Sequence, residues 1–169
     1  MGLGIVIHNT LLMVFFLTRR NSDRLSLRFA DWLVPVLTLG AAMLLRPAES
    51  ASDGWFGGNG SAWIQAAGMT GIILSLLSLG RSFGVIPANR SIVRRGAYRF
   101  VRHPLYMSEL IFYFGFVSAN ATAANIGLVL FITAGQLWRS VAEEKVLALD
   151  PAYRVYRKEV RFRFLPGLY

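Results

Sequence analysis

The chain has 169 residues, of which 54% are hydrophobic and only 16% charged, and it carries a formal net charge of +9. Its mean hydropathy of +0.47 exceeds that of an ordinary soluble domain of this size, so the composition favours an integral membrane protein. The absence of cysteine excludes disulfides and thiolate metal sites, and the two histidines lie far apart in sequence, so we predict no metal site.

Five apolar segments follow one another along the chain, at about 2–18, 30–45, 62–80, 105–119 and 121–138. At about 1.5 Å per helical residue, each is long enough, or nearly so, to cross a hydrocarbon core of about 30 Å. The short connection SANATAAN predicts that the fourth and fifth segments form an antiparallel hairpin. Small residues predict close approach between helices at Gly68, Gly71, Gly127, Ala134 and Gly135.

The fifth segment is predicted to continue as a helix beyond the membrane until Asp150 and Pro151 end it. A short amphipathic helix, AYRVYRKEVRF, is expected to follow and to lie at the membrane interface. We therefore predict one all-α domain over residues 1–169. It would be a polytopic membrane helical bundle of five transmembrane helices with a cytoplasmic C-terminal helical segment.

The positions of the basic residues predict the topology. Of the 18 Lys and Arg residues, four lie in the first connection, six between Arg81 and Arg102, and seven from Arg139 onward. Only Arg46 is left for the opposite side, where the connection over 46–61 adds Glu49 and Asp53. The positive-inside rule then predicts an outside N-terminus and a cytoplasmic C-terminus. Because these basic residues fall between apolar runs and not on one soluble face, we expect membrane lipids and no nucleic acid as partners.

Two polar pieces, residues 94–106 and 139–147, are expected to meet on the cytoplasmic side, because the hairpin between them returns the chain to that side. In the second piece Arg139 and Glu143 are four residues apart and share a helix face, with Glu144 beside them. The simpler alternative is that these glutamates form a solvated helix face and that the loop arginines serve topology and anionic headgroups.

Three residues near the start of the fourth segment stand out. Arg102 and His103 precede Pro104, whose fixed φ restrains the backbone there, and a histidine in this setting is suited to bind a ligand. Glu109 lies about one turn inside the segment, where an unpaired carboxylate is costly and normally faces a cavity or a partner. The alternative for Glu109 is that it reaches the interface or pairs with a loop arginine.

GAYRFVRHPLYMSEL, followed after one hairpin by EEKVLALDPAYRVYRKEVRFRFLP, resembles the isoprenylcysteine carboxyl methyltransferase family, which is related to the membrane phospholipid methyltransferases. The shared pattern is Gly-x-Tyr, Arg-His-Pro-x-Tyr, Glu-Glu, a pair of tyrosines and a terminal Arg-Phe-x-Pro. It covers about residues 92–166. Family members often have glycine two residues after the motif tyrosine, where this chain has Ser108.

The resemblance implies a methyltransferase that binds S-adenosylmethionine, and releases S-adenosylhomocysteine, in a cytoplasmic pocket closed by the C-terminal segment. A lipophilic or prenylated acceptor would enter sideways from the bilayer. The implied cofactor-binding residues are Tyr98, Arg102, His103, Pro104, Tyr106, Glu143 and Glu144, with Tyr153 and Tyr156 in a lid. Arginine, histidine and paired glutamates suit a cofactor that carries a carboxylate, an ammonium and ribose hydroxyls.

The acceptor determines which further residues would be catalytic. A carboxylate acceptor needs only orientation, for which Arg139 or Arg102 would serve. An amine acceptor must lose a proton, which Glu109 or Glu143 would take as general base. The predicted function is carboxyl O-methylation of an isoprenylcysteine-like substrate, with phospholipid amine N-methylation as the alternative. Two other hypotheses are an NADPH-dependent reductase of the sterol type, which shares part of the Arg-His-Pro motif, and a non-catalytic membrane protein.

Overall fold

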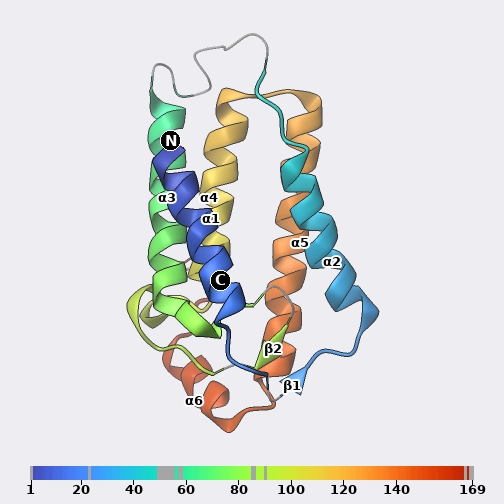
Figure 1. Cartoon of the computed structure of the whole chain (residues 1–169), viewed down its shortest axis with the longest axis vertical. Coiled ribbons are helices and arrows are strands. Elements are labelled where there is room, and N and C mark those ends of the chain that lie inside the picture. Colours follow the sequence, from blue (N-terminus) through green and yellow to red (C-terminus); the bar gives the residue numbers. More distant parts are fainter. Residues whose placement is uncertain are drawn as a thin grey trace.

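The computed structural model describes residues 2–22, 24–48, 56, 59–84, 87–89, 91–165 and 167, so Glu49 and Asp53 lie outside the described residues. The structure is mostly helical, in agreement with the predicted all-α class (Figure 1). The helices of the described part are α1 (Gly2–Leu17), α2 (Phe29–Met43), α3 (Gly60–Leu79), α4 (Pro104–Ala119), α5 (Ala123–Leu147) and α6 (Pro151–Glu159), with 3-10 turns η1 (Gly80–Ser82) and η2 (Gly96–Arg99).

The helix ends follow local sequence signals. Pro104 and Pro151 occupy the first turns of α4 and α6, where the missing N–H is not needed. Thr122 caps α5 by accepting a hydrogen bond from the Asn125 N–H at 3.1 Å, and Asp150 caps α6 through the Ala152 N–H at 2.8 Å. As predicted, α5 continues beyond the apolar run and ends shortly before the Asp-Pro pair.

One stretch among the described residues, Gly60–Ser82, is long and apolar enough by itself to cross a membrane. Most of α1 and all of α2 form shorter apolar helices. Five transmembrane helices were predicted, but fewer meet this test. The helices α1, α2 and α4 are too short for it, with 16, 15 and 16 residues. The C-terminal part of α5 contains charged residues.

The long helices pack in two groups, which Figure 1 shows side by side: α3 contacts α4 and α1, whereas α5 contacts mainly α2. The predicted α4–α5 hairpin forms, but each of its helices packs more closely against a helix of its own group. A strand pair, β1 (Arg24–Leu25) with β2 (Ala88–Asn89), lies at the same end of the bundle as α6 and was not predicted. Most of the basic connections therefore lie at one end of the bundle, near α6 and the strand pair (Figure 1).

Glycines permit the closest helix contacts, as predicted at three positions. A Cβ atom at Gly68 or Gly71 would lie 2.5 Å from an atom of α4, and one at Gly135 would lie 1.9 Å from α2. The prediction is wrong for Gly127, which has open space where a Cβ would be, and for Ala134, which is exposed. Both residues lie on faces of α5 that are exposed in the described part of the chain.

The C-terminal helix differs from the prediction in its surroundings. Its two tyrosines were expected at a membrane interface, but Tyr153 and Tyr156 are 2% and 3% exposed and pack against Ile92 and Leu147. The helix ends at Glu159, before the end of the predicted segment, because the chain then turns back along the start of α4. This arrangement places α6 against the end of the bundle where the polar connections meet.

Candidate active site

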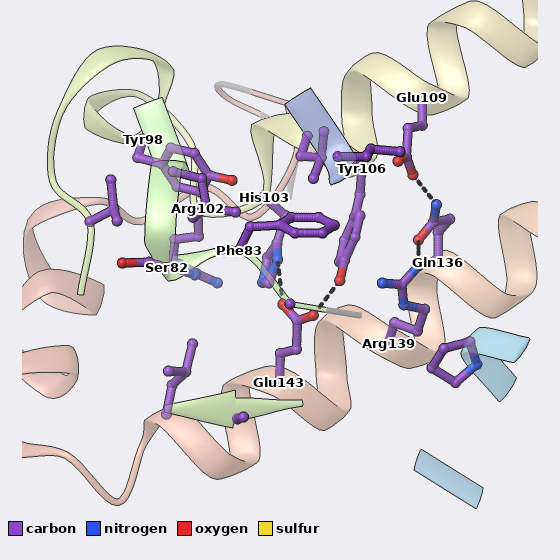
Figure 2. A pocket seen from close by; sticks show the side chains of 18 of the residues that line it. Ser82, Phe83, Tyr98, Arg102, His103, Tyr106, Glu109, Gln136, Arg139 and Glu143 are labelled. Carbon is purple, nitrogen blue, oxygen red and sulfur yellow. Dashed lines mark hydrogen bonds and ion pairs between the residues drawn. The ribbon is translucent and has the colours of Figure 1, made fainter. Parts of the chain in front are cut away.

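A cavity of about 430 Å³ lies between the two helix groups and extends to the polar end of the bundle. Its charged end is formed by η2, the start of α4, the C-terminal half of α5 and α6 (Figure 2), while α1 and α2 form an apolar arm. The predicted site residues in its wall are Tyr98, Arg102, His103, Tyr106, Glu109, Arg139, Glu143, Tyr153 and Tyr156. The structure therefore brings together residues separated by more than fifty positions in sequence.

Two predicted cofactor-binding residues, Pro104 and Glu144, are not part of the described cavity wall. Pro104 is buried in the first turn of α4 and determines where that helix begins. The Glu144 side chain is 5% exposed and points away from the cavity, into a cluster of cationic side chains. Among the described residues, the Glu144 carboxylate therefore contacts other side chains and does not line the cavity.

The cluster around Glu144 joins the start of α4 to the C-terminal segment. The Glu144 Oε1 atom accepts hydrogen bonds from Arg102 Nε at 2.8 Å and from His103 Nε2 at 3.2 Å, and Oε2 accepts one from Arg163 Nη2 at 2.9 Å. Burial alone would raise the pKa of Glu144, but the hydrogen bonds from His103, Arg163 and Arg102 outweigh it and hold the pKa well below its usual range. Glu144 is therefore a carboxylate at neutral pH.

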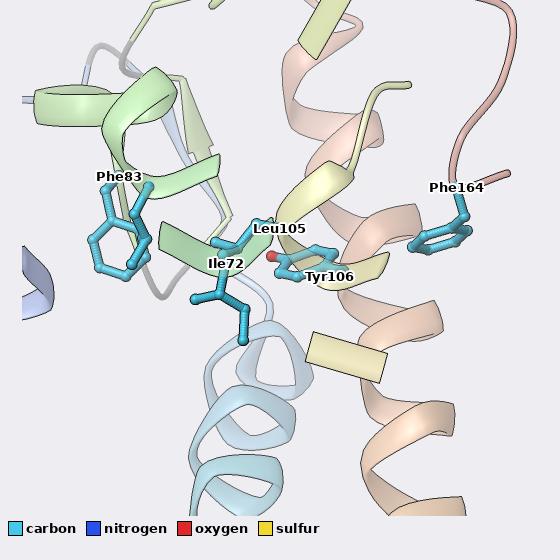
Figure 3. Packing of buried hydrophobic residues seen from close by; sticks show 6 residues of the cluster. Ile72, Phe83, Leu105, Tyr106 and Phe164 are labelled. Carbon is cyan, nitrogen blue, oxygen red and sulfur yellow. The ribbon is translucent and has the colours of Figure 1, made fainter. Parts of the chain in front are cut away.

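The C-terminal segment after α6 is fixed by backbone bonds and by packing. The N–H groups of Arg102 and His103 donate to the carbonyls of Phe162 and Arg163 at 3.0 and 2.9 Å. Phe164 is buried in the cluster that also contains Ile72, Phe83, Leu105 and Tyr106 (Figure 3). The segment thus covers the start of α4, where the Arg-His-Pro motif lies.

His103 lies between the two glutamates. Its Nε2 atom contacts Glu144, its Nδ1 atom lies 3.8 Å from Glu143 Oε2, and its ring stacks on Tyr106 with an angle of 6° between the planes. The Tyr106 hydroxyl donates a hydrogen bond to Glu143 Oε1, as Figure 2 shows. These contacts fix the imidazole and direct the Glu143 carboxylate toward the cavity, where 20% of its side chain is exposed.

Three tyrosines provide neutral hydroxyl and carbonyl groups at the charged end. The Tyr156 hydroxyl donates to the Tyr98 carbonyl at 2.7 Å. Burial raises the pKa of Tyr156 to about 12, and burial together with the nearby Glu143 charge raises the pKa of Tyr98 well above its usual value, so both stay protonated. The buried Tyr153 hydroxyl has no hydrogen-bond partner among the described residues, and its side chain lines the cavity.

Deeper in the bundle, Glu109, Gln136 and Arg139 form a second polar group in the cavity wall (Figure 2). The Gln136 amide donates to Glu109 Oε2 and accepts from Arg139 Nη1 at 3.3 Å. The Arg139 guanidinium lies 4.8 Å from the centre of the Tyr106 ring, within the range of a cation–π contact. This group lies where the charged end meets the apolar arm.

Two residues of these clusters were not predicted from the sequence. Gln136 belongs to no motif, and the available signal was its position three residues before Arg139, which places both on one helix face. Arg163 is the arginine of the terminal Arg-Phe-x-Pro, but nothing in the sequence shows that it contacts Glu144.

The fold and the cavity define a helical protein in which one pocket joins a charged end to an apolar arm. A sequence comparison matches residues 58–154 to the phospholipid methyltransferase family. The match covers more than half of the chain, which therefore belongs to this family of membrane methyltransferases. The family belongs to the same membrane methyltransferase group as the isoprenylcysteine carboxyl methyltransferases, so the resemblance seen in the sequence is confirmed at that level. A search of curated proteins found no match.

Proposed function

We propose that this membrane methyltransferase transfers a methyl group from S-adenosylmethionine to a lipophilic acceptor that enters from the bilayer. The observation that supports this most strongly is a cavity that has both a charged end and an apolar arm. The charged end suits a water-soluble cofactor and the arm suits a lipid chain, and the reacting groups would meet near Glu109 and Arg139. Family membership favours this proposal over the sterol-type reductase hypothesis.

We propose further that the chain is one integral membrane domain in which all five long helices span the bilayer, with the N-terminus outside and the charged end of the cavity cytoplasmic. Large apolar side chains that are exposed and lie outside the cavity wall support this, among them Val6, Val36, Met43, Trp63 and Leu130, each at least 60% exposed. The gathering of the basic connections at one end of the bundle agrees with the positive-inside rule.

The size of the cavity and the polar groups at its charged end support S-adenosylmethionine as the cofactor. A cavity of about 430 Å³ is within the usual range of small-molecule sites. The Glu143 carboxylate can accept from an ammonium or ribose hydroxyl, and the unpartnered Tyr153 hydroxyl can bond a polar group of the cofactor. Arg102 already bonds Glu144 and the Val160 carbonyl, so its role would be to hold the walls in place.

The bound cofactor would supply an electrophilic methyl group on a positively charged sulfur. The chain's own task is then to align the acceptor and to exclude water, because no nucleophilic side chain is needed. Arg139 would orient a carboxylate acceptor by a bidentate contact. Glu109 would take the proton from an amine acceptor. Carboxyl methylation of an isoprenylcysteine-like compound and N-methylation of a phospholipid amine are both proposed acceptor reactions, the first supported by Arg139 and the second by Glu109.

The proposal is tested by calorimetric titration of the detergent-solubilised protein with S-adenosylhomocysteine, with NADPH as the parallel ligand. We expect micromolar binding of the first compound and none of the second. The variant His103→Ala should weaken binding because it removes the ring that stacks on Tyr106 and bonds Glu144. Glu159→Gln, at an exposed ion pair with Arg94, is the matched control. Binding of NADPH alone would instead support a reductase.

Transfer of labelled methyl groups from S-adenosylmethionine then identifies the acceptor class. A prenylated cysteine analogue and phosphatidylethanolamine should be supplied in the same nanodiscs, so that both acceptors reach the protein through lipid. Transfer to one of them would assign the acceptor class. Cofactor binding without transfer to either would exclude both proposed acceptors.

A further inference from the structure

Gln136 has a buried amide that bonds both Glu109 and Arg139, where the charged end of the cavity meets the apolar arm. Its side chain is 4% exposed, and it bonds Glu109 through Nε2 and Arg139 through Oε1 (Figure 2). A carboxylate only accepts hydrogen bonds and a guanidinium only donates them, so these two neighbours allow one orientation of the amide. The side chain is therefore oriented by its partners and in turn restrains both of them.

The hydrogen bond from Gln136 matters because Glu109 has few other polar neighbours. The charged side chains near Glu109 are Arg139 and Glu143 on α5, and the phenols of Tyr106 and Tyr113 lie near it on α4. The described residues that α1 and α2 contribute to the cavity wall carry no charge. A carboxylate in such a setting depends on its few donors. The Gln136 N–H is a neutral donor that stabilises the carboxylate without neutralising its charge.

We propose that Gln136 is a positioning residue that holds Glu109 as a carboxylate directed into the cavity and keeps Arg139 beside it. The kinetic part of this proposal rests on the methyltransferase function proposed above. Gln136 then determines how well the site uses an amine acceptor, which needs an ionised Glu109, relative to a carboxylate acceptor, which needs Arg139. The restraint on Glu109 itself does not depend on which reaction the protein catalyses.

The direct test compares the full-length protein with Gln136→Met, which keeps the length and volume of the side chain but removes both hydrogen bonds. The rate at which dicyclohexylcarbodiimide modifies Glu109 is measured by mass spectrometry, because this hydrophobic reagent attacks protonated carboxyls in apolar surroundings. Loss of the donor favours the protonated form, so we expect the rate measured at about pH 8 to rise severalfold. Gln65→Met is the matched control, since Gln65 is a buried glutamine that bonds the Gly115 carbonyl at 3.3 Å and lies outside the cavity wall.

A second variant keeps the test valid if Gln136→Met does not fold. Gln136→Glu preserves the shape and the acceptor for Arg139, but it places a second carboxyl against Glu109, and two adjacent carboxyls favour retention of a proton. The modification rate of Glu109 should rise here as well. A rate equal to that of the parent in either folded variant would overturn the proposal.

Acceptor kinetics separate this proposal from the proposed function. Gln136→Met should lower kcat for an amine acceptor about tenfold and kcat for a carboxylate acceptor less than about threefold, with the affinity for S-adenosylhomocysteine unchanged. A merely structural defect would lower the two kcat values equally, so an unequal loss would exclude it. If the modification rates rise but the parent transfers no methyl group, the function is wrong and the positioning role stands. If the parent transfers methyl groups and the modification rates do not change, the positioning role is wrong and the function stands.

Discussion

The Glu144 cluster leads to a quantitative prediction for Glu144→Gln. This substitution keeps the shape of the side chain but removes the charge that two guanidiniums and His103 share. Removing one partner of a buried ion pair costs about 3–5 kcal/mol. The glutamine carbonyl still accepts one hydrogen bond, so we expect the lower figure, about 3 kcal/mol. At about 1.4 kcal/mol per factor of ten, detachment of the C-terminal segment should become about a hundredfold more frequent.

Hydrogen–deuterium exchange measures this detachment directly. The amides of Arg102 and His103 donate to carbonyls of the C-terminal segment, so they exchange when the segment leaves. We expect both to exchange about a hundredfold faster in Glu144→Gln than in the parent. Glu159→Gln should change the exchange little, because its ion pair with Arg94 is exposed and such pairs contribute about 0–1 kcal/mol. Equal exchange in the two variants would refute the reasoning.

The same cluster predicts a pH dependence with a definite sign. The pKa of Glu144 is lower in the folded protein than in the unfolded chain, where a glutamate has a pKa of about 4.3. Its contribution to stability is therefore fully present above the unfolded pKa and is lost as the pH falls toward the folded pKa. Exchange of the Arg102 and His103 amides, corrected for intrinsic rates, should stay constant from neutral pH to about pH 5 and accelerate below it. In Glu144→Gln, the acceleration of exchange at acid pH should be absent.

The remaining predictions concern single contacts. Tyr153→Phe should leave the thermal stability unchanged, because the Tyr153 hydroxyl has no partner among the described residues, and should weaken S-adenosylhomocysteine binding about tenfold. Tyr156→Phe should instead lower the stability by about 1 kcal/mol, because it removes the hydrogen bond to the Tyr98 carbonyl. A thermal-shift assay can measure this difference. Glu109→Gln should depress amine methylation more than carboxyl methylation, and equal loss on both acceptors would exclude a general-base role. Gly71→Ala should destabilise the α3–α4 contact by about 1–3 kcal/mol, because its Cβ would lie 2.5 Å from Ser108 Oγ. Adding Ser108→Gly should restore the thermal stability, and a failure to do so would show that the clash lies elsewhere.

The contact between Gly71 and Ser108 also explains a departure from the family pattern. The chain has Ser108 where related proteins often have glycine, yet α3 and α4 still approach closely, because Gly71 provides the space on the facing helix. Sequence reasoning about one helix could not show this, since the compensating residue is more than thirty positions away. The two positions form one contact, and only their combined size matters for the packing.

Local rules of the sequence determined the helices. The apolar runs, the prolines that begin α4 and α6, and the caps at Thr122 and Asp150 depend on residues a few positions apart, and the structure agrees with them closely. The ordered motifs were sufficient to identify the methyltransferase group. They also named most of the charged and aromatic residues that line the cavity.

Tertiary structure decided what each of those residues contacts. Glu143 and Glu144 are equivalent in the sequence, but neighbours on a helix point about 100° apart, so one faces the cavity and the other faces Arg102 and Arg163. Gln136 gains its role from Glu109 on another helix, and no local pattern records that pairing. The sequence by itself determines the helices and an inventory of chemical groups, whereas the packing of helices distant in sequence determines which groups form a cluster and which face a ligand.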